Sequence, residues 1–309
     1  MESSRAVRRH RARSSRRRTL LLSVLAVIAM ACGTAYVKTH DDGHGTPVSS
    51  APAATSSPAA RTQEEPVPET DRAASLKTAM GAVRVPGDAA VSVGVLDLAS
   101  GDSAVYGETA FDTASIVKVD ILAALLLQAQ DAGRALTAQE RSYAALMIEN
   151  SDNDSASALW NTIGRAKGLD AANDRFGMTG TEGGEGALWG LTQTTAADQL
   201  ALLQQVFGDS SELSGASREY VRGLMAQVEA DQAWGVSAAA QGAEWALKNG
   251  WLPRSTTGLW DVNSIGRVSA GGGVYLVAVL SDGSVSMAAG VSLVEEVARV
   301  AVGAFTAGS

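Results

Sequence analysis

Two residue types that often do chemistry are missing from most of this chain, which narrows the reactions open to it. Residues 71–309 contain no histidine and no cysteine. This part therefore has no imidazole base, no thiolate nucleophile and no histidine zinc site. Lysine is the base left to activate a serine, and we expect neither a metal nor a cofactor. The three histidines and the one cysteine all come earlier, as His10, His40, His44 and Cys32.

Ser115 and Lys118 form the first candidate pair, and they are the only Ser-x-x-Lys in the chain. Residues three apart in a helix lie on the same side, so Lys118 is expected beside Ser115. Asp112 or Thr113 is expected to cap this helix. The residues as far as Leu122 are mostly apolar, so we expect Lys118 to be desolvated and its pKa lowered. A neutral lysine can take the proton of a serine nucleophile.

A second motif, Ser151-Asp152-Asn153, falls between two segments of helical period. Serine, aspartate and asparagine are common helix caps, so local structure alone could explain them. In a functional interpretation, the Ser151 hydroxyl relays a proton to a leaving nitrogen, and the Asn153 amide holds the substrate and the lysine. The sequence leaves both interpretations open.

A third motif, Lys248-Asn249-Gly250, lies at the edge of a predicted strand. Lys248 could bind a carboxylate, and Gly250 could let a substrate approach the backbone. An exposed lysine before a turn would explain the tripeptide equally well. Trp251 and Trp260 flank this strand and are the tryptophans that we expect to line a cleft.

The hydrophobic pattern predicts an α+β fold. The period is helical from residue 113 to about 241, which indicates an all-helical lobe (about 112–241) inserted into a five-stranded antiparallel sheet. N- and C-terminal helices should flank the sheet, with a cleft between the sheet and the lobe. Gly271 to Gly273 should form the last hairpin turn, and Ser292 to Glu295 is a capping-box pattern that should open the last helix. The other expected elements are a helix at 73–83 and strands at 91–95, 103–107, 245–247, 259–268 and 274–280.

The N-terminal residues predict export of everything that follows. Residues 1–18 hold eight arginines and one glutamate and are expected to be a basic cytoplasmic n-region. Residues 19–37 have no charged residue and are long enough to cross a bilayer, as a cleaved signal, a retained anchor or, through Cys32, a lipidation site. Residues 38–70 have the composition of a disordered linker. The domain at 71–309 is extracytoplasmic in each version.

The body of the protein is acidic. After residue 18 the chain has 17 basic and 32 acidic residues, a balance of −15 against −8 for the whole chain. Nucleic-acid binding needs a clustered basic surface, so we expect no such partner. We expect a monomer that meets the membrane only through its N-terminal segment.

Taken in this order, the three motifs resemble the superfamily of class A-like serine β-lactamases and penicillin-binding DD-peptidases. The resemblance covers about residues 75–305, including the strand layout and the inserted helical lobe. It implies that a serine attacks a β-lactam, or the D-Ala-D-Ala peptide of a peptidoglycan stem, to give an acyl-enzyme. It also implies the β-lactamase/transpeptidase-like form of the α+β fold.

The resemblance assigns roles to individual residues. The catalytic set that it implies is Ser115 as nucleophile, Lys118 as base, Ser151 as proton relay and Lys248 as carboxylate anchor. The substrate-binding set that it implies is Asn153, Asn249, Gly250 and Trp251. The backbone N–H groups of Ser115 and Trp251 would stabilise the oxyanion.

The sequence departs from class A enzymes in ways that concern the fate of the acyl-enzyme. Asn249 replaces the usual threonine or serine, and the interval from Ser115 to Ser151 is short. The Glu-x-x-Asn loop that activates the deacylating water has no counterpart, and we expect Glu182 and Glu185 to be solvated loop carboxylates. Three outcomes therefore stay open: a β-lactamase, a DD-peptidase or other cell-wall amidase, and a sensor that keeps its adduct.

Overall fold

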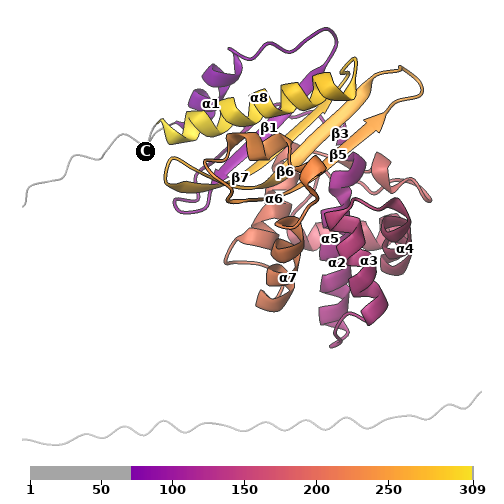
Figure 1. Ribbon diagram of the computed structural model, residues 1–309. Coiled ribbons are helices and arrows are strands. Elements are labelled where there is room, and N and C mark those ends of the chain that lie inside the picture. Colours follow the sequence, from indigo (N-terminus) through magenta and orange to yellow (C-terminus); the bar gives the residue numbers. More distant parts are fainter. Residues whose placement is uncertain (1–70, 308–309) are drawn as a thin grey trace, which may run out of the picture. The chain divides into compact units, whose positions relative to one another are not determined.

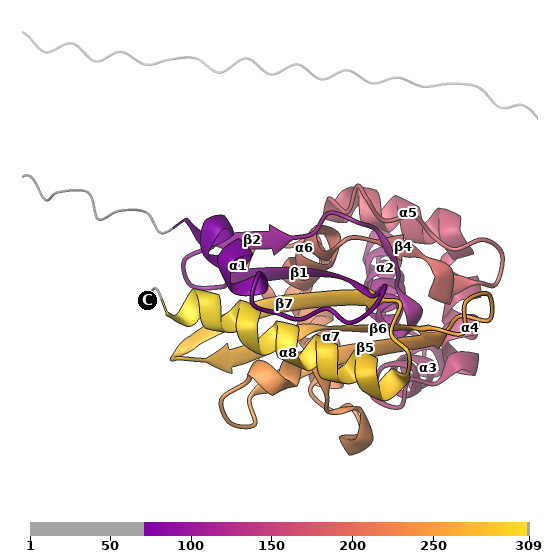
Figure 2. The same cartoon turned by 90° about the horizontal axis from the view of Figure 1, so that it is seen from above.

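The computed structural model describes residues 71–307, and a five-stranded antiparallel sheet with helices on both faces dominates it (Figure 1). The strands run in the order β2-β1-β7-β6-β5, so β5 is an edge strand. Helices α1 and α8 lie over one face of the sheet (Figure 2), and the helical lobe lies against the other. This confirms the expected α+β arrangement.

The bounds of the elements agree with most of the expected ranges. The strands are β1 (Ala90–Asp97), β2 (Ser103–Tyr106), β3 (Phe111–Asp112), β4 (Gln193–Thr194), β5 (Trp245–Pro253), β6 (Trp260–Ala270) and β7 (Gly273–Asp282). The helices are α1 (Arg72–Met80), α2 (Val117–Asp131), α3 (Ala138–Glu149), α4 (Asn153–Ile163), α5 (Arg165–Phe176), α6 (Ala196–Phe207), α7 (Gly215–Met225) and α8 (Met287–Thr306). Short 3-10 turns are η1 (Ala114–Ile116), η2 (Trp189–Leu191), η3 (Ala230–Gln232) and η4 (Gly235–Ala239).

The sheet separates two hydrophobic cores, because alternate residues of a strand point to opposite faces. Val93 and Val277 pack with α1 and α8, whereas Leu96 and Ala278 pack with α2 and α6. Both cores consist of fully or almost fully buried apolar side chains, most of them aliphatic. The sheet is therefore packed on both faces, and its edge strand β5 lies against the lobe.

The hairpin between β6 and β7 turns at Gly271 and Gly272, as expected. Both residues have positive φ angles, 57° and 81°, which glycine adopts without strain. Strand β5 is longer than the pattern predicted and ends at Pro253. The Lys248 motif therefore lies inside a strand.

Two expectations are wrong in detail. The lobe is not all-helical, because β3 and β4 pair through Phe111 with Thr194 and Asp112 with Gln193. Two-residue strands are too short to show a period in the sequence.

The last helix also begins earlier than the capping-box pattern indicated. Ser286 caps α8 by accepting a hydrogen bond from the Ala289 N–H (3.1 Å). Ser292 lies inside the helix and donates to the Ala288 carbonyl (3.0 Å). Gly290 packs so closely on Val262 that a Cβ there would lie 2.4 Å from a valine methyl, which explains a glycine inside this helix.

The expected basic, apolar and linker segments at 1–18, 19–37 and 38–70 lie outside the described residues. Between residues 71 and 307, no helix has the length and apolar character that a membrane span requires.

Candidate active site

Ser115 lies in η1, the tight turn that leads into α2, and lines a cavity. The residue before it, Ala114, has a φ of 47°, a left-handed conformation that is strained for alanine. The Ser115 side chain is half-buried and makes no hydrogen bond to any residue in 71–307. The turn thus presents an unengaged hydroxyl to the cavity.

Neither expected cap holds this turn. Thr113 occupies the N-cap position without a side-chain cap hydrogen bond. The Asp112 carboxylate instead binds the Arg254 guanidinium and the Gln193 amide. These contacts fix η1 from the side, where the sequence predicted a cap.

Lys118 lies in the first turn of α2 and is completely buried. Its Nζ donates to the Ser151 carbonyl (2.6 Å), the Ser151 Oγ (3.1 Å) and the Asn153 Oδ1 (2.8 Å). Burial lowers the pKa of Lys118 to about 7, although the Asp152 carboxylate acts in the opposite direction. A large share of this lysine is therefore neutral near neutral pH.

The three partners of Lys118 suit a neutral amine. A neutral amine has two N–H donors and one lone pair, whereas an ammonium has three donors. The Ser151 carbonyl and Asn153 Oδ1 can only accept, so they take the two N–H groups. The Ser151 hydroxyl can donate to the lone pair. The site therefore accommodates Lys118 in the form that can act as a base.

Ser151 turns toward Lys118 because its backbone is left-handed, with a φ of 56°. The next residue, Asp152, caps α4 by accepting from the Ser155 N–H (2.7 Å). The structure shows the local cap and also brings this motif to the lysine. Asp152 is a local cap, while Ser151 and Asn153 on either side of it contact the buried lysine.

Lys248 is also completely buried and shares the Ser151 hydroxyl with Lys118. Its Nζ donates to the Ser151 Oγ (3.0 Å) and to the Asn249 carbonyl (2.8 Å). Burial lowers the pKa of Lys248 well below the usual lysine value, and the nearby Lys118 lowers it further. Lys248 does not line the cavity, and its Nζ contacts the Ser151 hydroxyl. Its expected role as the anchor of a substrate carboxylate stays a prediction.

Asn249, expected to contact substrate, points away from the cavity. Its amide is buried and donates to the carbonyls of Gln232 (2.7 Å) and Trp234 (3.0 Å). Neighbouring residues of a strand point to opposite faces, so Lys248 and Asn249 cannot both face Ser151. Asn249 anchors the segment around η3 and η4.

Gly250 brings β5 into backbone contact with η1. A Cβ on Gly250 would lie 2.7 Å from the Ser115 nitrogen and 2.8 Å from both the Ile116 nitrogen and the Thr113 carbonyl oxygen. The sequence suggested that this glycine lets a substrate approach. In the structure it lets η1, the turn that contains Ser115, approach the strand.

We predict that Gly250→Ala lowers the free energy of unfolding by about 1–3 kcal/mol, because the methyl group forces β5 away from η1. The matched control is Gly223→Ala in α7, where a Cβ meets nothing within 4 Å. That substitution should raise the free energy of unfolding by roughly 0.5–1 kcal/mol. Urea denaturation of both variants is the measurement, and equal stability of the two would contradict the close approach.

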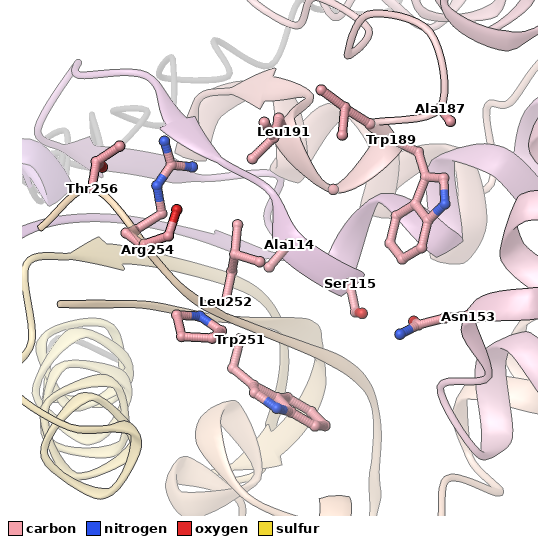
Figure 3. A pocket seen from close by; sticks show the side chains of 14 residues that line it. Ala114, Ser115, Asn153, Ala187, Trp189, Leu191, Trp251, Leu252, Arg254 and Thr256 are labelled. Carbon is pink, nitrogen blue, oxygen red and sulfur yellow. The ribbon is translucent and has the colours of Figure 1, made fainter. Parts of the chain in front are cut away.

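The cavity beside Ser115 has a volume of about 510 Å³ (Figure 3). Figure 3 shows Ser115 and Asn153 pointing toward one another, with Trp189 and Trp251 on either side of Ser115. Its lining residues are Ala114, Ser115, Asn153, Ala187 to Leu191 and Trp251 to Thr256. Trp251 lines it as expected, but Trp260 does not.

Trp189 is a site residue that the sequence did not reveal. Its ring lies over Lys118, with Nζ 5.0 Å from the ring centroid, and its indole N–H donates to the Ser157 hydroxyl (3.1 Å). The tryptophan thus shields the lysine from solvent. Nothing in the glycine-rich sequence around it indicates this contact.

None of the residues that line this cavity in the described part of the chain is an aspartate or a glutamate. Glu182 and Glu185 are exposed and do not line it, in agreement with their interpretation as solvated loop carboxylates. Among the described residues, the site therefore brings together a free serine hydroxyl and a buried lysine, and no carboxylate lines it.

Comparison with known proteins gives a family match. A family model described as "Beta-lactamase enzyme family" matches residues 133–305. This range includes Ser151, Asn153 and Lys248 and begins after Ser115 and Lys118. No curated protein sequence matches the chain significantly.

Solved structures share the fold at low sequence identity. An acyl-enzyme complex of a PBP-A variant with penicillin G is 22% identical, with a TM-score of 0.64 over 75% of this chain and 96% of that chain. A class A β-lactamase of Bacteroides cellulosilyticus is 14% identical, with a TM-score of 0.65 over 76% of this chain and 99% of that chain. The TLA-1 extended-spectrum β-lactamase is also 14% identical, with a TM-score of 0.65 over 76% and 98%.

Proposed function

Because the chain belongs to the beta-lactamase enzyme family, we propose that Ser115 attacks the amide carbonyl of a β-lactam and forms an acyl-enzyme. The observation that supports this most strongly is the buried, three-coordinated Lys118 one helical turn from the unengaged Ser115 hydroxyl. The penicillin G adduct of the PBP-A variant, which has the same fold, supports the choice of substrate.

In the proposed acylation, neutral Lys118 takes the proton from the Ser115 Oγ as the new C–O bond forms. The developing oxyanion accepts hydrogen bonds from the backbone N–H groups of Ser115 and Trp251. When the C–N bond breaks, the Ser151 hydroxyl gives its proton to the leaving nitrogen. Lys118, now protonated, returns a proton to Ser151 through their 3.1 Å contact.

Lys248 supports this relay by hydrogen bonding. Its Nζ lies 3.0 Å from the Ser151 Oγ and stabilises the alkoxide character that develops on Ser151 as the proton leaves. Asn153 holds Lys118 through its Oδ1 and lines the cavity, so it can also contact the acyl group. Trp251 and Trp189 supply flat apolar walls for that group.

We propose further that the acyl-enzyme is long-lived. Hydrolysis of the ester needs a base beside the attacking water, and the lining of the cavity contains no carboxylate. Without a general base the attack of water is slower by about 10²–10⁴-fold. A DD-peptidase or a β-lactam sensor that keeps its adduct fits this arrangement better than a rapidly hydrolysing β-lactamase.

An intact-mass time course of the protein with penicillin G tests both steps. We expect a stoichiometric adduct of the full penicillin mass that forms and then persists over many minutes. Hydrolysed drug with little standing adduct would contradict slow deacylation and indicate a β-lactamase. No adduct and no hydrolysis would contradict acylation itself.

The arginine block and apolar segment in residues 1–37 support export of this domain. Export would bring the site to the compartment that contains peptidoglycan. A membrane-anchored or secreted form is part of the proposal.

A further inference from the structure

A second cavity adjoins the one beside Ser115. It has a volume of about 430 Å³ and shares Arg254 and Thr256 with the first cavity. Figure 3 shows these two residues on the side of the first cavity away from Asn153. We call this second cavity the acidic annex, because four carboxylates line it: Asp88, Asp112, Asp261 and Asp282.

One guanidinium faces these four carboxylates, and it already binds one of them. Among residues 71–307, Arg254 is the only basic residue that lines the acidic annex, and its Nη1 binds Asp112. The same nitrogen forms a longer ion pair with the Asp261 Oδ2 (3.7 Å), which is beyond hydrogen-bonding distance. Within the described part of the chain, the Asp282 carboxylate accepts a hydrogen bond only from the Ala90 N–H (3.2 Å). The annex therefore keeps an excess of negative charge.

Asp261 is the carboxylate whose position calls for a further donor. Its side chain comes from β6, the residue is only 5% exposed, and its Oδ2 is buried without any hydrogen bond. Burial raises the pKa of Asp261 to about 6, with Arg254 lowering it and Asp282 raising it. An acceptor that is buried without a donor is unfavourable, so a cation that supplies N–H groups would stabilise this group.

The chemistry of the annex favours an organic ammonium over a metal ion. Within residues 71–307, no group of three or more His, Cys, Asp or Glu side chains is arranged to hold a metal. A primary ammonium carries three N–H donors on one compact charge, which suits several carboxylates around one space. The hydroxyls of Thr256 and Thr257 on the wall can accept as well.

The annex is also within reach of an acyl group on Ser115. Asp112 precedes Ser115 by three residues, so their Cα atoms are at most about 11 Å apart. Consider an acyl group on Ser115 that is one amino acid long and carries an amine at the end of a four-carbon side chain. Its amine lies at a distance from Ser115 similar to that between these two Cα atoms.

We propose that the acidic annex binds a side-chain ammonium group of the acyl donor. The preferred substrates are then peptides, or β-lactams, that carry a primary amine on the acyl side of the scissile amide. This inference rests on the proposed acylation of Ser115 and specifies its substrate class.

Two penicillins that differ only at the end of the acyl side chain provide the test, one with a primary ammonium and the other with the same amine acetylated. The rates of adduct formation by the full-length protein are compared by intact mass. We expect the ammonium compound to react about fivefold to tenfold faster. Asp261→Asn and Asp282→Asn should each bring this ratio toward one.

The matched control is Asp174→Asn in α5, an exposed residue that lines neither cavity. It removes the same charge from elsewhere on the protein and should leave the ratio as in the wild type. A wild-type ratio near one overturns the proposal. So does a ratio that survives both annex substitutions, or one that Asp174→Asn reduces equally.

A binding experiment separates failure of the annex from failure of acylation. Calorimetric titration with Nα-acetyl-lysine amide, at a pH at which Asp261 is ionised, needs no reaction at Ser115. We expect saturable binding that Asp261→Asn abolishes and that Nε-acetylation of the probe also abolishes. If neither penicillin forms an adduct, acylation is wrong and this titration still decides the annex. Absence of binding to the wild type overturns the annex.

Discussion

Ser115→Ala abolishes covalent labelling of the protein by penicillin G, and this is the largest effect that we expect from a single substitution. The hydroxyl is the atom that becomes the ester oxygen, so its removal leaves nothing for the β-lactam carbonyl to join. The Ser115 side chain makes no hydrogen bond within residues 71–307, so the variant should keep the stability of the wild type. Intact mass and thermal unfolding together measure the two expectations.

Ser255→Ala is the matched control for this experiment. Ser255 lines the same cavity, is exposed and loses the same atom, but it lies after β5 and away from Lys118. Its variant should be labelled at the wild-type rate. If Ser115→Ala is still labelled, Ser115 is not the nucleophile. If Ser255→Ala is not labelled, Ser255 is the residue that reacts.

Lys118→Ala slows acylation by about 10²–10⁴-fold, because the proton of Ser115 loses its acceptor. Lys118→Arg should be similarly slow, since a guanidinium stays protonated at every accessible pH. The exposed Lys77 in α1 gives the control, and Lys77→Ala should react like the wild type. The rate of adduct formation under excess penicillin is the measurement.

The pH dependence follows from the lowered pKa of Lys118. The neutral amine is the base, and its fraction rises as the pH passes through the lysine pKa of about 7. The rate of acylation should therefore increase tenfold per pH unit well below pH 7 and level off above it. This rise of the acylation rate with pH should be absent in Lys118→Ala. An unchanged rate in that variant, or a wild-type profile that is flat between pH 5 and 9, would exclude Lys118 as the base.

The sequence was sufficient to predict the sheet and the residues around Lys118. The hydrophobic pattern located β1 and β7, and a run of helical period separated β1 and β2 from β5, β6 and β7. The order of the three motifs then predicted that Ser115, Ser151 and Lys248 meet, because the lobe has to fold back on the sheet. The hydrogen bonds of Lys118 and Lys248 to Ser151 show that the three motifs come together there, and Ser115 and Asn153 line the same cavity.

Other features could not be predicted from the sequence, because they depend on tertiary contacts. Trp189 covers Lys118 and belongs to a loop whose sequence is mostly glycine and alanine. No periodic pattern predicts where such a loop packs. The acidic annex draws its carboxylates from four separate segments of the chain. The side of β5 that Asn249 occupies was predictable in principle from strand alternation, once Lys248 was assigned to the lobe side.

The contact between Gly250 and η1 also limits how this site can change over evolution. Main-chain atoms of Ser115 and Ile116 set the spacing between η1 and β5, so a side chain added at Gly250 would widen the gap there only at a cost in stability. Selection for the acceptance of bulkier compounds must instead act on the rim of the cavity, by which we mean the side chains of Trp189 and Trp251. These side chains can be replaced without moving η1 or β5. Variants that broaden the range of accepted compounds should therefore gather at the rim, with the Gly250 contact left intact.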